Sequence, residues 1–255
     1  MAQDPPRCPY RGLAPPPELR EHLLCGWTVG PHSGGSETVL PDGSIDIVWH
    51  EGGAPILAGP DTGPVPSARP PDSTVVGVSF RPGAAPAMLG IPADELRDLR
   101  VPLAEVWDGD AGRIEQGLDD GDAPSARLRL IQEALRRRLK RAERPDRLVV
   151  EAVARLRAPG LPRVGALGDE LGISERHLRR RFNAAVGYGP KTAARVLRFQ
   201  RMLALARKGA GRDLGQLAVD AGYADQAHMT AECTRLAGAP PARLLAERYL
   251  LHTTA

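Results

Sequence analysis

The sequence predicts an α+β protein, in which a mainly β N-terminal part (barrel or sandwich-like, with flanking helices) precedes an all-α C-terminal part. Up to about residue 110, short alternating or β-branched runs are separated by turns rich in Gly and Pro. From residue 161 onward every segment has helical periodicity, and one helical plan occurs twice around a long middle helix. The charge divides in the same way, with 15 Lys and Arg against 8 Asp and Glu in residues 161–255, and 19 against 23 before them.

The chain is long enough for two globular domains with separate cores, since it has 255 residues, 42% of them hydrophobic and 25% charged. We expect a β-rich domain at 1–110, connecting helices at 111–160 and a helical domain at 161–255. The sequence has no run that would span a membrane, and its start lacks the basic-then-apolar order of a signal peptide. We therefore expect a cytoplasmic protein whose basic C-terminal part meets a polyanion.

The N-terminal strands are predicted from turns and alternation. Pro41-Asp42-Gly43 marks a turn before a strand at 44–50, and a further short strand follows at 55–58. In the run 75–80, alternation predicts two faces. One face consists of Val76, Val78 and Phe80, and the other of Val75, Gly77 and Ser79.

The middle of the chain is predicted to be helical. "IPADELRDLRVPLAEVW" indicates a short helix with a turn, and "SARLRLIQEALRRRLKRAE" has apolar residues at spacings of three and four. "PDRLVVEAVARLRAPG" indicates a further helix, which Pro145-Asp146 would open and Pro159-Gly160 would close. These helices are expected to join the two halves of the protein.

The first helical unit is "VGALGDELGISERHLRRRFNAAVG", for which we predict a helix at 164–171, a turn at Gly172-Ile173 and a second helix capped by Ser174. Leucine, phenylalanine and valine recur every four residues on the second helix and mark its buried side. The opposite, polar side holds Arg176, Arg180 and Asn183, with Arg179 at its edge. Two helices around a tight glycine turn, with arginines outside, are typical of a helix-turn-helix whose second helix enters the DNA major groove. The alternative reading of this face is a solvated surface.

The second unit, "LGQLAVDAGYADQAHMTAECTRLAGAPP", repeats this plan. Leu217 matches Leu167, and Gly222 matches Gly172. The later pairs are Met229 with Leu178, Cys233 with Phe182, Gly238 with Gly187 and Pro241 with Pro190. The long linker helix between the two helix-turn-helix units would hold two recognition helices at a fixed separation, and successive major grooves are about 34 Å apart. One chain could thus read two adjacent grooves.

Residues 164–248 resemble the AraC/XylS-type transcription regulators through "LGISERHLRRRF", "VGYGPKTAARVLRFQRML" and "AGYADQAHMT". The N-terminal part resembles the sensory half of a subset of these regulators through "LPDGSIDIVW", "AGPDTGP" and "FRPGAAPAMLGIPADELRDLRVPLAEVW". The resemblance implies regulation of transcription through double-stranded promoter or operator DNA, and an N-terminal domain with a sensory or assembly role. It brings no known ligand with it.

Carried over by position, the base contacts of the family fall on Arg176, Arg179 and Arg180 in the first unit. In the second unit they fall on Gln226, Ala227, His228, Thr230 and Ala231. This sequence departs from the family where Ala231 and Cys233 stand, since an arginine and a large aromatic residue are common there. Glu232 would repel phosphate unless it turned away or accepted a hydrogen bond from cytosine. We predict that the first helix supplies most of the sequence-specific energy.

The predicted DNA contacts include two residues near helix N-termini, Ser174 and Lys191, which are placed to meet phosphates. The full set is Ser174, Arg176, Arg179, Arg180, Asn183, Lys191, Gln226, His228 and Thr230. For a small-molecule effector in the N-terminal domain, the candidates are Asp46, Trp49, His50 and Arg81. The alternative is a purely structural role, in which Trp49 belongs to the core and Asp46 pairs with Arg81. RNA polymerase and a second copy of the chain are the other partners we consider, with no membrane contact.

We predict no metal, no cofactor and no enzymatic activity. Cys8, His22, Cys25 and His32 are close in sequence, and His22 and Cys25 would share a helix face, but paired CxxC elements are absent. GxSxG, HExxH and phosphate-loop motifs are absent as well. Two alternatives for the N-terminal domain stay open: a ligand-free protein-interaction module, and a metal or thiol sensor using Cys8 or Cys25.

Overall fold

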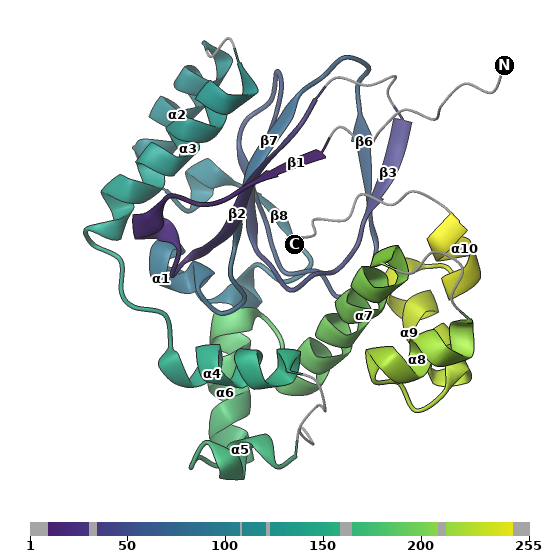
Figure 1. Cartoon of the computed structure of the whole chain (residues 1–255). Coiled ribbons are helices and arrows are strands. Elements are labelled where there is room, and N and C mark those ends of the chain that lie inside the picture. The colour runs from purple at the N-terminus through teal and green to yellow at the C-terminus, as the bar shows by residue number, and fades with distance from the viewer. Residues whose placement is uncertain are drawn as a thin grey trace, which may run out of the picture.

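The computed structural model describes residues 10–30, 35–107, 109–120, 123–158, 165–208 and 213–246. Figure 1 shows strands and their covering helices on one side, and the helices α4 to α10 below and beside them. The α+β class expected from the sequence is therefore confirmed. Within the described ranges, no helix is both long enough and apolar enough to cross a lipid bilayer.

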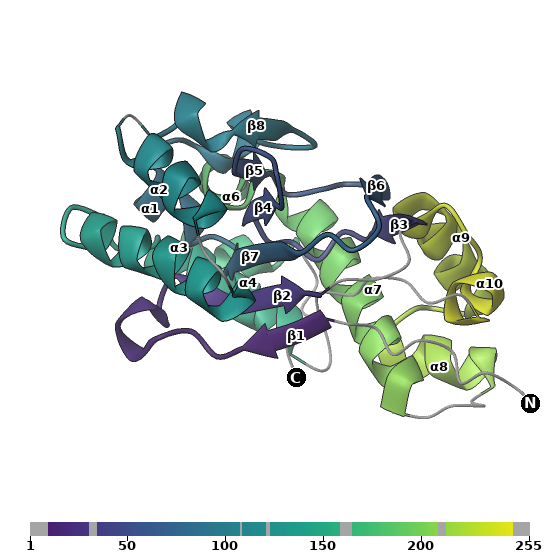
Figure 2. The ribbon, with the colours of Figure 1, turned by 90° about the horizontal axis from the view of Figure 1, so that it is seen from above.

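The N-terminal part is built on a six-stranded antiparallel sheet and a separate two-stranded pair. The strands of the sheet, in spatial order, are β1 (Tyr10–Leu13), β2 (Leu23–Val29), β7 (Val75–Phe80), β4 (Asp46–His50), β5 (Ile56–Ala58) and β8 (Arg100–Pro102). The pair consists of β3 (Gly35–Val39) and β6 (Val65–Arg69), which lie apart from the helix-covered side of the sheet in Figures 1 and 2.

The alternation predicted for β7 is confirmed. Val76, Val78 and Phe80 join the core under the helices, whereas Val75 belongs to a smaller cluster on the other face with Trp27. Ser79 also lies on that face, where its hydroxyl accepts a hydrogen bond from Trp27 Nε1 at 3.1 Å. The sheet is therefore buried on both faces.

Short helices and turns close the ends of the sheet. These are η1 (Pro17–Leu19), α1 (Ala85–Leu89), η2 (Ala93–Glu95) and η3 (Leu103–Glu105). Two segments have a secondary structure that differs from the one predicted from the sequence. His22 and Cys25 share no helix, because residues 23–29 form the strand β2, which lies between β1 and β7. The short helix expected near residue 95 is reduced to the two 3-10 turns around β8.

The connecting helices divide between the two halves. α2 (Asp110–Asp119) and α3 (Pro124–Leu139) cover the sheet, and Leu128, Ile131 and Leu135 pack into its core. α4 (Arg147–Arg157) instead packs with the C-terminal helices through Val149, Ala152, Val153 and Leu156. The chain thus passes from one core to the other between residues 139 and 147.

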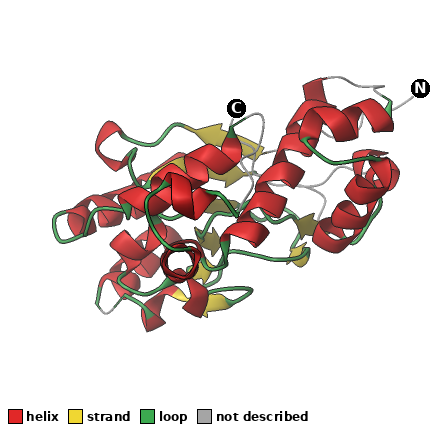
Figure 3. Ribbon diagram, turned by 90° about the horizontal axis from the view of Figure 1, so that it is seen from below, coloured by secondary structure: helices red, strands yellow, loops and turns green. Residues whose placement is uncertain are grey.

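Every secondary-structure element described in the C-terminal part is a helix, drawn red in Figure 3. Its helices are α5 (Leu167–Glu170), α6 (Glu175–Val186), α7 (Pro190–Lys208), α8 (Leu214–Ala221), α9 (Gln226–Ala237) and α10 (Pro241–Ala246). The two helix-turn-helix units and the long linker helix expected from the sequence are confirmed. α5 is shorter than the predicted helix at 164–171, and residue 164 lies outside the described residues.

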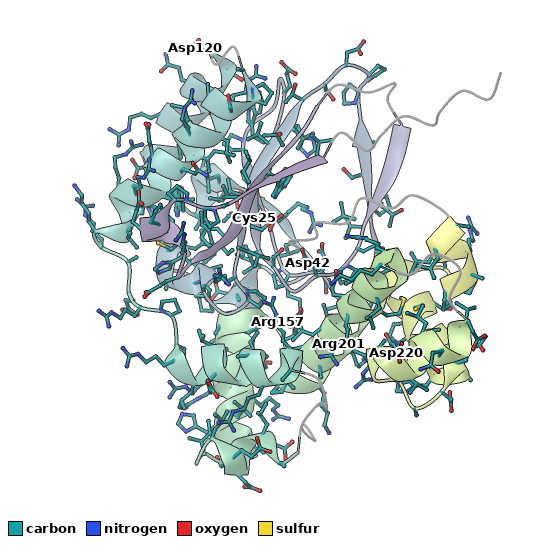
Figure 4. All side chains as sticks on the ribbon, in the orientation of Figure 1. Cys25, Asp42, Asp120, Arg157, Arg201 and Asp220 are labelled. Carbon is teal, nitrogen blue, oxygen red and sulfur yellow. The ribbon has the colours of Figure 1, made fainter. Side chains whose placement is uncertain are left out.

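The two parts are in close contact through the segment before β4. Leu40 is buried in the core of the C-terminal helices, and Gln200 Nε2 of α7 donates a hydrogen bond to the Pro41 carbonyl at 2.7 Å. Gly187, at the end of α6, has a φ of +94° and abuts the N-terminal part so closely that an added Cβ would overlap Pro60. Figure 4 labels Asp42 of this segment, and Arg157 and Arg201, whose guanidinium group binds the Arg157 carbonyl.

Candidate nucleic-acid interface

The first recognition helix, α6, is fixed at both ends. The Ser174 hydroxyl accepts a hydrogen bond from the His177 amide at 3.2 Å, which makes Ser174 the N-cap as predicted. Leu178 and Phe182 are fully buried, and Gly187 ends the helix in the left-handed conformation. The buried side of α6 thus fixes which residues it presents outward.

The outward side of α6 carries a shallow depression of about 410 Å³. Its lining residues are Ser174, Arg176, His177, Arg179, Arg180 and Asn183. Arg176, Arg179 and Arg180 are exposed, and none of the three forms an ion pair with a described residue. The structure therefore brings together all five α6 residues proposed as DNA contacts; the sequence reading left out His177.

The fourth arginine of α6 has a different environment. Arg181 binds Asp146 with two hydrogen bonds of 2.7 Å, and Asp146 also caps α4 by accepting from the Leu148 amide at 3.0 Å. Although burial favours the neutral acid, these hydrogen bonds and the charge of Arg181 hold the pKa of Asp146 below its usual range. Arg181 therefore anchors α6 to α4.

The second recognition helix, α9, has the same frame and a different surface. The Asp225 carboxylate caps it by accepting from the His228 amide at 2.7 Å, and Gly238 ends it in the left-handed conformation. Gln226 is exposed, whereas the Thr230 hydroxyl donates to the Gln226 carbonyl at 2.8 Å. Small residues occupy most of the remaining exposed positions of this helix, so it offers fewer groups to DNA than α6 does.

Glu232 turns away from the exposed side of α9. It accepts hydrogen bonds from Arg195 at 2.9 Å and Arg198 at 3.5 Å, both on α7, and only 8% of the residue is exposed. His228 Nε2 lies 3.7 Å from the same carboxylate, and the imidazole ring packs against the Tyr223 ring in a T-shaped arrangement. Glu232 is thus withdrawn from the surface where it would repel phosphate, and His228 is held partly by the protein.

The linker helix α7 holds the two units apart. It has 19 residues, which corresponds to a length of about 28 Å at 1.5 Å per residue. Val196, Phe199 and Met202 are buried in the core shared by both units. Lys191 is exposed in its first turn, close to the end of α6.

The four effector candidates of the N-terminal part do not form one site. Trp49 is completely buried on the helix-covered side of the sheet, with the Arg127 guanidinium 4.5 Å from its ring centroid. Arg81 donates to the Arg20 carbonyl at 2.7 Å, and His50 lies at the far end of β4 from Asp46. Of the four, only Asp46 lies on the opposite face of the sheet as a buried polar group.

Asp46 belongs to a chain of hydrogen-bonding side chains. Ser79 donates to one of its carboxyl oxygens at 3.1 Å, and the Ser44 hydroxyl lies 2.9 Å from the other and 2.7 Å from Asp42. Burial, and then the charge of Asp42, raises the pKa of Asp46 to about 8. The Ser44 hydroxyl thus bridges the carboxyl groups of Asp46 and Asp42. Because a hydroxyl has one proton to donate, a protonated Asp46 would donate to Ser44 and leave the Ser44 proton for Asp42.

The two described cysteines, Cys25 and Cys233, both lie in the protein interior. Among the described residues there is no group of three or more His, Cys, Asp or Glu suited to a metal ion. Cys25 and Cys233 are buried, and burial raises the pKa of Cys233 to about 12, which keeps its thiol protonated and unreactive. Cys8 and His32 lie outside the described residues.

Two known domain families match separate stretches of the chain. Residues 11–102 match the family of a domain of unknown function (DUF6597), and residues 167–247 match a family of helix-turn-helix domains. No curated protein matches the chain.

Among solved structures, the chain is similar to ToxT from Vibrio cholerae O395, with 11% identity, a TM-score of 0.44, and coverage of 84% of this chain and 97% of ToxT. Wild-type ToxT of strain SCE256 bound to an unsaturated fatty acid gives 10% identity, a TM-score of 0.45, and coverage of 88% and 95%. The family matches and the two units show that the C-terminal part is an AraC-type helix-turn-helix domain, which this chain joins to an N-terminal domain of unknown function.

Proposed function

We propose that this protein is a sequence-specific transcription regulator whose helices α6 and α9 bind successive major grooves of promoter or operator DNA. The observation that carries the proposal is the exposed side of α6, where Arg176, Arg179 and Arg180 surround one depression without an ion pair to a described residue. Guanidinium groups make bidentate hydrogen bonds to guanine O6 and N7, and each such pair contributes about 1–3 kcal/mol of discrimination.

The two recognition helices have different roles in this proposal. α6 would supply most of the discrimination between bases, with Asn183 as a further polar group. α9 would mainly position the protein, because Gln226 is its only large polar side chain both exposed and proposed as a contact, while Thr230 and His228 are engaged internally. Ser174 and Lys191 would bind phosphates near the starts of α6 and α7.

The test is footprinting of the full-length chain on the DNA upstream of its own gene and of the neighbouring genes, at several salt concentrations. We expect protection over two successive major grooves and an affinity that falls steeply as salt rises. Weak binding to all sequences alike, without a protected site, would contradict the proposal.

We further propose that the N-terminal domain, assigned to residues 1–110, controls DNA binding by a ligand or by assembly. The support is the physical link between its interior and the C-terminal core. The chain Asp46–Ser44–Asp42 ends in the segment whose Leu40 and Pro41 contact the C-terminal helices. A ligand or partner with different affinities for two states of this segment would shift the DNA-binding equilibrium.

Asp46→Asn tests the protonation of Asp46 at the start of this chain, through the pH dependence of stability. The folded pKa of about 8 lies above the ordinary value of 3.8, so between these values the folded chain binds a proton that the unfolded chain has lost. The contribution of this bound proton to the free energy of unfolding is fully present below the ordinary pKa of 3.8, and it declines as the pH rises toward 8. We expect the decline in wild type and not in Asp46→Asn, measured by thermal unfolding from pH 5 to 9; parallel curves would exclude a titrating Asp46.

The two modes of control predict different measurements. A small-molecule effector would raise the melting temperature of the full-length chain in a ligand screen, since it binds only the folded state. An assembly module, acting through a homodimer or through contact with RNA polymerase, would instead give a sedimentation coefficient that rises with protein concentration or with added polymerase. A melting shift alone favours the effector, and concentration-dependent dimers alone favour assembly.

A further inference from the structure

A groove of about 1250 Å³ runs beside the first recognition helix. It lies between α1, the end of α3, the connection at 140–146 and α6. Arg180 lines both this groove and the depression on the outward side of α6. The groove therefore continues the proposed DNA surface sideways, from the C-terminal domain onto the N-terminal half.

The groove has a strong excess of positive charge. Eight of its lining residues are basic and three are acidic. Two of the acids are already paired within the groove, Asp110 with Arg113 and Asp146 with Arg181. Arg138 is also engaged, because it lies over the ring of Trp107 and donates to the Met88 carbonyl at 3.1 Å.

Five exposed cations remain. They are Arg137, Lys140, Arg141, Arg144 and Arg180, and none forms an ion pair or side-chain hydrogen bond with a described residue. Cations do favour the C-terminus of a helix, but that effect falls off within the last turn. α3 ends at Leu139, so Arg141 and Arg144 lie beyond its reach, and Arg180 comes from another domain. Helix stabilisation can account for Arg137 and Lys140, in the last turn and at the C-cap of α3, but not for Arg141, Arg144 and Arg180.

Crowded like charges oppose folding unless a counter-charge is present. Burial lowers the pKa of Arg138 most, the charge of Asp110 opposes this, and the charge of Arg141 lowers the pKa further. A polyanion that enters the groove would relieve this repulsion. The polyanion that the proposed function already brings to Arg180 is the DNA duplex.

We propose that the groove binds the sugar–phosphate backbone of the duplex that α6 reads, so that the 140–146 connection is itself part of the DNA-binding surface. This inference rests on the proposed function and extends it. Lys140, Arg141 and Arg144 contact phosphates flanking the first major groove, whereas Arg176 and Arg180 contact bases. The N-terminal half then contributes affinity without sequence information, and movement of the connection changes DNA affinity directly.

The test is the triple variant Lys140→Ala/Arg141→Ala/Arg144→Ala of the full-length chain. Its matched control is Arg20→Ala/Arg97→Ala/Arg129→Ala, which removes three exposed cations of the N-terminal half that do not line the groove. Affinity is measured as a function of salt on the footprinted duplex and on a duplex of random sequence. Thermal unfolding checks that both variants are folded.

We expect the groove variant to lose affinity equally on both duplexes, and its salt slope to fall by about 0.9 for each lost phosphate contact. The control should keep the slope of wild type. In hydroxyl-radical footprints the groove variant should lose protection of the backbone beside the α6 site and keep the rest.

Equal losses in the two variants would reveal a general charge effect and overturn the inference. An unchanged salt slope in the groove variant would also overturn it, and would leave the groove to a small anionic ligand or an acidic protein segment. If wild type itself protects no site, the proposed function fails; the comparison of salt slopes on the random duplex still decides whether the groove binds DNA backbone.

Discussion

The two helix-turn-helix units have the same frame and present different surfaces. Ser174 and Asp225 stand at equivalent positions and cap α6 and α9 by accepting from equivalent histidine amides. Gly187 and Gly238 end both helices with positive φ. The exposed positions differ, since Arg176 and Arg180 are replaced by Ala227 and Ala231 in the second unit.

Even the anchoring position has the opposite charge. Arg181 and Glu232 are equivalent in the two units, and each ties its recognition helix to a supporting helix, Arg181 through Asp146 and Glu232 through Arg195 and Arg198. The comparison teaches that caps, core and one anchoring ion pair define the unit. The sign of that pair and the identity of the outward residues can differ without changing the fold.

The largest effect is expected from breaking the more buried anchor. Glu232→Ala should destabilise the protein by about 3 kcal/mol, the low end for breaking a buried ion pair, because Arg195 can regain water. Arg181→Ala should cost only about 1 kcal/mol, since its pair with Asp146 is partly exposed. Chemical denaturation measures both; equal losses would contradict the different burial of the two anchors. Glu232→Gln controls for side-chain volume.

The next effect concerns DNA affinity. Arg176→Ala and Arg180→Ala should each weaken specific binding by about 1–3 kcal/mol, or roughly 5- to 150-fold, whereas Gln226→Ala should cost less. Binding titrations on the footprinted duplex and on a random duplex separate base recognition from phosphate contact. Equal or larger losses in Gln226→Ala would overturn the ranking of the two helices.

The smallest effect tests the shared frame itself. Ser174→Ala and Asp225→Ala each remove one N-cap and should destabilise the protein by about 1 kcal/mol each. Similar values in denaturation curves would support equivalent capping in the two units. A loss confined to one variant would show that the other helix does not depend on its cap. Glu175→Gln, which leaves the Ser174 cap in place, is the control for α6.

Local signals explain which parts of the fold the sequence predicts well. The cap of α6, its buried positions at four-residue spacing and its terminal glycine all lie within fourteen residues. The sequence therefore predicts this helix correctly. β2 was missed because it is buried on both faces, so its apolar run has no alternation to reveal a strand. Without alternation, the sequence also permits a helix at this point, with His22 and Cys25 on one of its faces.

Long-range pairing explains what could not be predicted at the candidate site. Nothing near Glu232 in the sequence indicates that it turns inward, since Arg195 and Arg198 lie more than thirty residues before it. The basic groove likewise depends on the packing of α6 beside the connection at 140–146. The one local signal for the groove in the sequence is the run of cations around residue 140.

The burial of Leu40 among the C-terminal helices has a consequence for how the chain folds. The ribosome makes this residue more than a hundred positions before α6, yet the C-terminal core is complete only when Leu40 enters it. Contacts of such sequence separation slow folding, and domains normally fold in order of synthesis. We therefore expect the last step of folding to be the docking of the two halves, and an isolated C-terminal fragment to leave an apolar cavity that favours aggregation.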